Sequence, residues 1–290
     1  MANVRAIRAR VKSVESTRKI TKSMKMVAAA KLKRTQQSML SLQPYAEAAR
    51  EMLSRVSADP SARDNPFLRE RDVQKVLYVL FVGNRGLCGV YNTALLKFAE
   101  GCLERETRDA SVLVCGRWGR DLMAASPLPI AGQLPELPDA PGMEEVKALS
   151  DALKERYLSG EADEIVLLYE HYASALRQEP CAKKLLPVDP PAGGTGERDV
   201  ILEPDGKSLV DSLVGLYIDN TVRAVVLEAK TGEHSARMTA MTAASDNTEQ
   251  LLAELNLELN HARQSAITTE ISEIVGGANA LQSSKEGKRG

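Results

Sequence analysis

Apolar residues at both ends of the chain recur at alternating spacings of three and four. The first series continues for about seven heptads and includes three successive polar positions, and a second series lies near the C-terminus. Such a repeat predicts long helices that pair as a left-handed coiled coil. The N-terminal series consists of Val4, Ile7, Val11, Val14, Arg18, Thr21, Lys25, Ala28, Leu32, Thr35, Met39, Leu42, Ala46, Ala49, Leu53 and Val56. The C-terminal series consists of Leu213, Tyr217, Ala224, Leu227, Met238, Met241, Leu252, Leu255, Leu259 and Ala262.

Residues that break helices are scarce in these two stretches. The first glycine is Gly83 and no proline follows Pro204, so neither end has the pattern of a looped domain. Pro44 is the exception, and we expect it to kink the first helix or change its course, because it removes a backbone hydrogen bond and clashes with the preceding turn. We expect residues 4–56 to pair antiparallel with residues 209–262, and the longer C-terminal helix to continue alone beyond that segment.

The middle of the chain has a different pattern. Three short apolar runs, at residues 76–83, 111–116 and 164–169, have the character of buried strands. Residues 92–104 and 143–158 show helical spacing instead. This alternation predicts a small Rossmann-like α/β head domain, inserted between the two helices of a long antiparallel coiled coil.

Two further stretches complete the predicted organisation. Residues 127–141 are rich in proline and predict a loop, and residues 187–197 predict a flexible connector to the last helix. The predicted fold class is therefore α/β in three parts: an N-terminal coiled-coil helix at 1–58, an α/β head at 59–204 and a C-terminal coiled-coil helix at 205–290.

The composition predicts a soluble, cytosol-facing protein. With 290 residues, 43% of them apolar, and a formal net charge of -1, the chain is large enough for one ordinary domain plus extended helices. It has no run of about 20 apolar residues and no signal-peptide core near its start, so we expect any membrane contact to be made through other chains. The cysteines lack metal-ligand spacing and are expected to be reduced core residues: Cys88, Cys102, Cys115 and Cys181.

Charge is distributed unevenly along the chain. Residues 1–34 hold eleven Lys or Arg and one acid, Glu15, for a net of +10, which leaves -11 for the remainder. This basic helix could be a solvated coiled-coil face, a surface for nucleic acid or anionic lipid, or a helix enclosed by an acidic protein. No aromatic residue precedes Tyr45 to stack on bases, and no nucleic-acid-binding module is recognisable. We therefore expect no nucleic-acid partner and favour an acidic protein sleeve.

Three features suggest an enzyme, and each weakens on inspection. Residues 83–89, GNRGLCG, follow a strand as a phosphate-binding turn does, but their spacing is neither a dinucleotide fingerprint nor a Walker loop. Residues 206–208, GKS, end like a P-loop, but Ile201 stands where its first glycine is needed. The three histidines lie far apart without clustered carboxylates. We predict no catalytic residue, no cofactor and no metal, and expect the isolated chain neither to bind ATP tightly nor to hydrolyse it.

Several segments, taken in order, resemble one known family. Residues 10–28 read RVKSVESTRKITKSMKMVA, residues 233–241 read EHSARMTAM, and residues 262–278 read ARQSAITTEISEIVGGA. The first is similar to the N-terminal signature of the F-type ATP synthase gamma subunit family, and the other two are similar to its C-terminal signature. Residues 85–89, RGLCG, together with Asn92, resemble its glycine-rich turn. The resemblance covers essentially the whole chain.

The resemblance implies the role of a central rotor shaft. In this family the coiled coil lies in the bore of a hexamer of alpha and beta subunits, and the head rests on the proton-driven ring of c subunits with the epsilon subunit. Catalysis belongs to the partners, and rotation of the asymmetric shaft changes the nucleotide affinity of each beta subunit in turn. Because linkage is reciprocal, nucleotide occupancy also biases the shaft angle.

The resemblance also implies a location. The family member would be a peripheral protein on the cytoplasmic face of the bacterial inner membrane. The coiled-coil motif begins at once in this chain, so we expect no transit peptide. The head also lacks the paired-cysteine insertion of chloroplast relatives.

Four polar residues near the C-terminus match family positions that hydrogen-bond with the surrounding subunits, which implies a catch between rotor and stator. They are Arg263, Gln264, Thr268 and Glu270. Solvation of the helix surface is the alternative explanation. An apolar stripe beside them is displaced by one residue from the earlier seam and is expected to bear on a hydrophobic collar. It consists of Ile267, Ile271, Ile274, Ala278 and Leu281.

Two more residues, Met24 and Arg237, match positions associated with coupling efficiency where the two strands meet. Ordinary coiled-coil packing is the alternative explanation for both. The seam is polar near Met24, at Arg18, Thr21 and Lys25, so we expect the coiled coil to be locally weaker there.

The chain departs from the family pattern at two places. Asn84 stands where the family usually has aspartate, and Thr231-Gly232 replaces a more helix-favouring pair. Gly232 predicts local flexibility because glycine in a helix interior costs about 1 kcal/mol relative to alanine. Two other classes of protein remain open. A structural coiled-coil adaptor would explain the heptads but not residues 263–277, and a nucleotide-binding enzyme would explain the turn at Gly83 but not the long helices.

Overall fold

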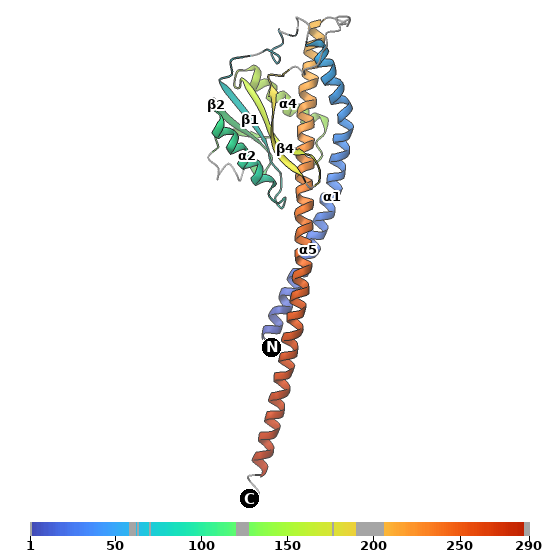
Figure 1. Ribbon diagram of the computed structural model, residues 1–290, viewed down its shortest axis with the longest axis vertical. Helices are drawn as coiled ribbons and strands as arrows, with labels where there is room; N and C mark the ends of the chain where they lie inside the picture. Colours follow the sequence, from blue (N-terminus) through green and yellow to red (C-terminus); the bar gives the residue numbers. More distant parts are fainter. Residues whose placement is uncertain are drawn as a thin grey trace. The chain divides into compact units, whose positions relative to one another are not determined.

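Two long helices dominate the computed structural model (Figure 1). It describes residues 2–57, 62, 64–69, 71–119, 128–175, 177–189 and 206–286, with backbone only for residues 2, 3 and 278–286. Helix α1 spans Ala2–Val56 and helix α5 spans Gly206–Glu286. Pro44 lies inside α1 without ending it. Most of the predicted connector at 187–197 falls outside the described residues.

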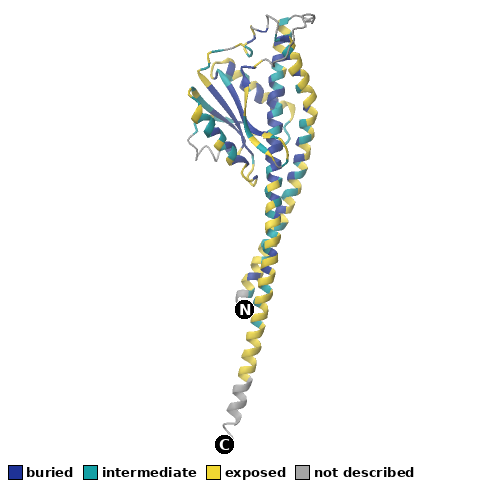
Figure 2. Ribbon diagram, in the orientation of Figure 1, coloured by how far each residue is buried: buried dark blue, intermediate teal, exposed yellow. Residues whose placement is uncertain are grey.

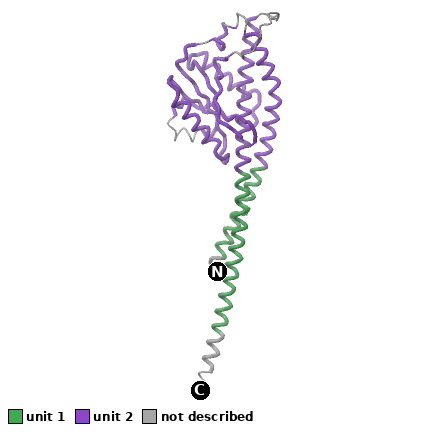
Figure 3. Tube along the Cα trace, viewed as in Figure 1, with its two compact units in different colours: residues 1–25, 241–290 green, residues 26–240 purple. Residues whose placement is uncertain are grey.

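The predicted heptad positions lie on the covered side of their helices, and Leu53, Val56 and Leu213 belong to a core cluster that also contains strand residues. All residues of both heptad series are buried or half-buried, including the polar Arg18, Thr21 and Lys25. The chain divides into two compact units (Figure 3): Met1–Lys25 with Met241–Gly290, and Met26–Ala240. In each unit the α1 and α5 segments run in opposite directions, as the sequence predicted.

The second unit contains a five-stranded sheet with the order β3-β2-β1-β4-β5. Its first four strands are parallel, whereas β5 pairs antiparallel with β4. The strands are β1 Lys75–Phe81, β2 Asp109–Cys115, β3 Ile130–Leu134, β4 Glu164–Tyr172 and β5 Gln178–Leu186. The predicted strands correspond to β1, β2 and β4, so the α/β fold class is confirmed.

The prediction of a loop over residues 127–141 was wrong in part, because β3 lies within it. Strand β5 was not predicted either. Both are edge strands, and an edge strand needs neither a continuous apolar run nor a backbone donor at each residue. Accordingly β5 contains Pro180 and exposed lysines, and β3 has one buried residue, Leu134.

Helices cover both faces of the sheet. Successive residues of β1 point to opposite faces, so Leu77, Val79 and Phe81 join one core cluster while Val76, Tyr78 and Leu80 join another. The first cluster is completed by α4 (Met143–Leu158), the end of α1 and the first part of α5, and the second by α2 (Tyr91–Arg105). Figure 2 shows the sheet as the most continuously buried region of this unit.

Two sequence expectations concern thiols and membranes. All four cysteines are free, with Cys88 and Cys115 buried and Cys102 and Cys181 half-buried. Across the described residues, no helix combines the length and the apolarity that crossing a bilayer requires.

Candidate functional site

The C-terminal end of α5 carries the four predicted catch residues on an exposed helix. Arg263, Gln264, Thr268 and Glu270 are all exposed. The Thr268 hydroxyl donates to the Gln264 carbonyl at 3.0 Å, within the same helix. Among the described residues, no hydrogen bond or ion pair joins these four side chains to another element. The side chains of Arg263, Gln264 and Glu270 are therefore available to a partner.

An apolar stripe lies on the same stretch of helix. Ile267, Ile271, Ile274 and Val275 are 46%, 56%, 66% and 52% exposed. Their spacing of four, three and one places them on one side of the helix. Ala278 and Leu281, which were predicted to extend the stripe, lie outside the residues whose side chains are described.

Met24 and Arg237 fall in different compact units, so each is described by itself. Met24 is half-buried in the first unit. Nearby, Thr21 is 8% exposed, and its hydroxyl donates to the Arg18 carbonyl at 3.0 Å. Local backbone bonding thus accounts for one polar residue in the seam.

Arg237 belongs to the second unit, where it binds the glycine-rich turn. Its Nη2 donates to the Arg85 carbonyl at 2.9 Å and to Glu233 Oε1 at 2.7 Å, and its Nε donates to the Gly86 carbonyl at 3.3 Å. Its Nη1 contacts His234 Nδ1 at 3.3 Å. Arg237 is 8% exposed. These contacts fasten α5 to the turn that follows β1.

Glu233 lies between two cations inside the protein. Its Oε2 accepts from Lys230 Nζ at 3.3 Å, and its Oε1 accepts from Arg237. Glu233 is 2% and Lys230 is 6% exposed. Burial alone would raise the pKa of Glu233, but the charges of Lys230 and Arg237 outweigh it and hold the pKa below its usual range. Glu233 is therefore a buried anion that compensates two buried cations.

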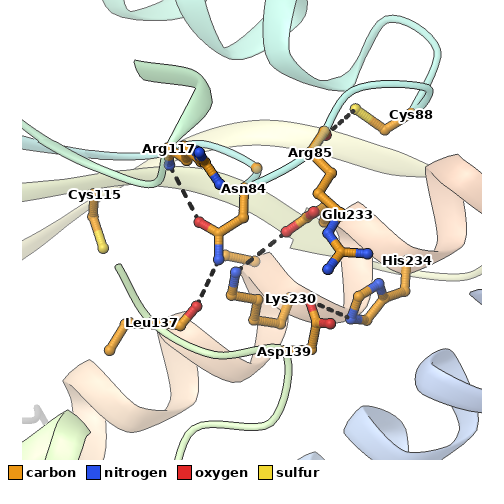
Figure 4. Close-up of polar contacts among 12 residues, drawn as sticks. Asn84, Arg85, Cys88, Cys115, Arg117, Leu137, Asp139, Lys230, Glu233 and His234 are labelled. Atoms are coloured by element: carbon orange, nitrogen blue, oxygen red, sulfur yellow. Dashed lines mark hydrogen bonds and ion pairs between the residues drawn. The ribbon is translucent and has the colours of Figure 1, made fainter. Parts of the chain in front are cut away.

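His234 links the same helix to the loop before α4 (Figure 4). Its Nε2 lies 3.8 Å from Asp139 Oδ1 and has no hydrogen-bond partner among the described residues. Burial lowers the pKa of His234 to about 4, so the ring is neutral at pH 7. Asp139 accepts from Lys31 of α1 at 2.5 Å. Burial would raise the pKa of Asp139, but this lysine holds it below its usual range.

Asn84 joins three segments around the same turn. Its Nδ2 donates to the Leu137 carbonyl at 2.7 Å, and its Oδ1 accepts from the Arg117 amide at 3.2 Å (Figure 4). An aspartate has no donor for the Leu137 carbonyl. An asparagine at this position therefore has a local structural reason.

Glu170 of β4 is a buried acid that the sequence reasoning missed. It is 4% exposed, and burial raises its pKa to about 7. The signal was its parity along the strand, because Val166, Leu168 and Glu170 share one face. A Cβ added at Gly232 would lie 3.7 Å from the Glu170 Cβ and 3.3 Å from Cε2 of Tyr91. Gly232 therefore marks a close approach of α5 to Tyr91 and Glu170, and the local flexibility expected from its helix propensity stays a prediction.

The carboxyl end of β1 is the place where Rossmann-like sheets bind phosphate groups. Here the Gly83 amide donates to Asn92 Oδ1 at 2.9 Å, and a Cβ added at Gly83 would lie 3.1 Å from Cδ of Glu233. The cavity that remains, lined in part by Asn84, Tyr91 and Glu233, has a volume of about 10 Å³, room for about one water molecule. The Glu233 side chain and this small cavity leave no room for a phosphate group. Among the described residues, no group of His, Cys, Asp and Glu side chains could hold a metal.

A family match and individual relatives each cover nearly the whole chain. Residues 3–281 match the protein family described as ATP synthase. The chain is 40% identical over 282 residues to the ATP synthase gamma chain of Desulfitobacterium hafniense, covering 97% of this chain and 100% of the relative. It is 39% identical over 290 residues to that of Prosthecochloris aestuarii, covering 97% and 99%.

Solved structures have the same fold at lower identity. A chain in the Euglena gracilis mitochondrial ATP synthase, OSCP/F1/c-ring in rotational state 3, matches with a TM-score of 0.69 at 21% identity, covering 98% of this chain and 96% of that chain. A chain in the rotor of the same species' enzyme matches with a TM-score of 0.63 at 19% identity, covering 92% and 99%.

Proposed function

The chain belongs to the ATP synthase gamma chain family, and from this premise we propose that it is the central rotor shaft of a proton-translocating F-type ATP synthase. Its partners are the alpha and beta subunits of the catalytic hexamer, the epsilon subunit and the ring of c subunits. In this role it couples proton-driven rotation to the conformational cycle of the beta subunits. The three-part division at 1–58, 59–204 and 205–290 remains part of the proposal.

The observation that carries the proposal is the change of environment along α5. Residues 229–235 are buried without interruption, whereas residues 267–277 are all exposed. Helices in proteins draw most of their stability from packing an apolar face, yet Ile267, Ile271 and Ile274 are largely exposed. A bore lined by other subunits would cover them. Arg263, Gln264, Thr268 and Glu270 then form the catch against the hexamer.

The shaft is non-catalytic in this proposal. The Glu233 side chain fills the place where a dinucleotide-binding fold would take phosphate, because a Cβ added at Gly83 would lie 3.1 Å from its Cδ. Any ATP chemistry therefore belongs to the partner subunits. The chain reaches the membrane through the complex, as a peripheral protein on the cytoplasmic face of the bacterial inner membrane.

The test is purification through a tag on this chain. We expect the alpha, beta, epsilon and c subunits to co-purify, ATP hydrolysis to appear in the complex but not in the isolated chain, and ATP to drive proton uptake into vesicles that contain the complex. Calorimetry on the isolated chain should detect no tight ATP binding. Micromolar affinity for ATP would favour a nucleotide-binding enzyme. Recovery of this chain only with other proteins would favour a structural adaptor.

A further inference from the structure

We propose that Gly232, Glu233 and Arg237, together with Tyr91 and the turn at residues 84–90, form a joint that makes the α/β head and α5 rotate as one body. Glu233 is its positioning residue. The inference rests on the proposed function, because a joint of this kind affects coupling only in a rotor.

The place of the joint along α5 supports this role. Ala229 belongs to the core cluster on one face of the sheet, and Ala236 packs against the cluster on the other face. Between them, α5 passes the carboxyl ends of β1 and β4, where Gly83 and Glu170 lie. The second compact unit ends soon afterwards, at Ala240. A torque that travels along α5 from its C-terminal half therefore reaches the head first through these contacts.

The first component is the close approach at Gly232. A methyl group there would lie 3.3 Å from the Tyr91 ring. The Tyr91 hydroxyl donates to the Ala229 carbonyl at 2.9 Å, and Tyr91 is 2% exposed. The ring is thus held on the helix backbone, three residues before the glycine. Because Gly232 has no side chain, the α5 backbone lies directly against the Tyr91 ring. This close contact leaves little space for α5 to move relative to the ring.

The second component is the attachment of Arg237 to the turn. Hydrogen bonds from a guanidinium to two successive carbonyls, at Arg85 and Gly86, are directional and charge-assisted. The hydrophobic contacts nearby are not directional. The turn itself is well defined: Leu87 has a positive φ of 60°, and the Cys88 thiol contacts the Arg85 carbonyl at 3.7 Å.

Glu233 keeps the guanidinium in position. Its Oε1 accepts from the same Nη2 that bonds the Arg85 carbonyl, and its Oε2 holds Lys230. Without this carboxylate, Lys230 and Arg237 would be two buried cations without compensation, and one or both would turn toward water. Arg237 would then release the turn. A change at Glu233 therefore acts through Arg237 and not through a partner subunit.

The experiment combines a loosened joint with a covalent replacement. Glu233→Gln keeps the side-chain shape and removes the charge, and Glu155→Gln on the exposed face of α4 is the matched control. The replacement is the double substitution Gly89→Cys with Ala240→Cys, because a Cβ at Gly89 would lie 3.8 Å from the Ala240 Cβ. Gly89 has a φ of 60°, which strains a cysteine there, so the oxidised and reduced forms of the same protein are compared and share this strain. Disulfides have Cβ separations of about 3.5–4.5 Å. Cys88 stays in place because it belongs to the turn, and peptide mapping of the oxidised protein identifies which cysteines have joined.

Protons pumped per ATP hydrolysed are measured on the assembled complex in vesicles. We expect Glu233→Gln to lower this ratio by about threefold or more while hydrolysis continues, and Glu155→Gln to leave it unchanged. Oxidation of the cysteine pair should restore the ratio in the Glu233→Gln protein, and a reductant should abolish the rescue. An unchanged ratio in Glu233→Gln, or a formed disulfide that does not restore it, would overturn the proposal.

Two further measurements keep the outcome clear. If Glu233→Gln does not assemble, Gly232→Ala carries the same test, with the same expected fall and rescue. On the isolated chain, hydrogen exchange of the amides at residues 84–90 should be faster in Glu233→Gln than in Glu155→Gln, and equal rates would count against the joint. If the chain with an intact joint supports no pumping, the proposed rotor function fails. A failure confined to the variants concerns the joint alone.

Discussion

At the scale of single residues, two glycines of α5 provide a matched pair. A Cβ at Gly232 would lie 3.3 Å from Tyr91, whereas a Cβ at Gly215 would have no atom within 4 Å. Alanine favours a helix over glycine by about 1 kcal/mol, but crowding in a packed core costs about 1–3 kcal/mol. We predict that Gly215→Ala raises the free energy of unfolding by about 0.5–1 kcal/mol and that Gly232→Ala lowers it by about 1 kcal/mol.

Urea titration of the isolated chain checks this pair. Similar increases in both variants would show that Tyr91 moves aside freely, and that Gly232 is not a close contact.

Glu170 predicts a pH dependence of stability. Its ordinary pKa of 4.5 is raised to about 7 by burial, so the folded chain binds more protons than the unfolded chain between these values. Stability contributed by this site therefore falls as the pH rises from about 4.5 to 7. We predict that Glu170→Gln is stabilised relative to the natural protein by an amount that grows from pH 5 to pH 8, up to about 3 kcal/mol.

Glu106 provides the opposite case for the same measurement. A hydrogen bond from Arg108 lowers its pKa to about 2, so its stabilising contribution is present above pH 4.5 and is lost only toward pH 2. Glu106→Gln should therefore be destabilised by a similar amount at pH 5 and pH 8. If both variants showed the same trend with pH, the shift assigned to Glu170 would be wrong.

At the scale of elements, the sequence predicts those helices and strands whose buried residues recur at regular spacing. The heptads located α1 and α5, and the apolar runs located β1, β2 and β4, because burial on one or both sides leaves a regular pattern. The strands β3 and β5 show no such regular pattern of apolar residues. Each lies at an edge of the sheet, where one backbone edge of the strand has no neighbouring strand. Burial of a single acid leaves a weaker signal still, and Glu170 becomes visible only when the parity of β4 is known.

The candidate site was predicted unevenly for a related reason. The segment from Glu233 to Arg237 was found through its resemblance to a family, but its partners are backbone carbonyls of Arg85 and Gly86. A carbonyl is present at every residue, so sequence carries no mark of which one is used. Asp139 reaches Lys31 across 108 residues of chain, and only the fold brings such pairs together.

The exposed stripe on α5 predicts a separation of folding from assembly. Ile271 and Ile274 are 56% and 66% exposed in the isolated chain, so Ile271→Ser with Ile274→Ser should change its unfolding free energy by no more than about 0.5 kcal/mol. In the complex the same change removes apolar contact with the bore, and we expect ATP synthesis to fall several-fold. The matched control is Glu258→Ser at an exposed position nearer the seam. Loss of stability in the isolated double variant would mean that the stripe already packs within the chain.

At the scale of the whole molecule, Met24 tests coupling in the complete complex. Met24→Lys adds a cation beside Lys25 in a half-buried stretch of the seam. A like-charge contact at about 4 Å costs about 1–4 kcal/mol at effective dielectric constants of 80 to 20, unless the new ammonium group binds a carboxylate of a beta subunit. In either case we predict that ATP hydrolysis persists while proton pumping falls. An unchanged ratio of protons to ATP at several temperatures would remove Met24 from the coupling machinery.

The uncovered end of α5 also bears on how a cell must make this protein. A newly synthesised copy presents Ile267, Ile271, Ile274 and Val275 to solvent, and in the proposed complex other subunits enclose them. Apolar surface of this kind recruits chaperones or other copies of the same chain. Copies made in excess of the other subunits are therefore prone to aggregate. We expect the cell to synthesise this chain in proportion to the subunits that enclose α5. Synthesis of this chain in excess should lead to its aggregation or degradation.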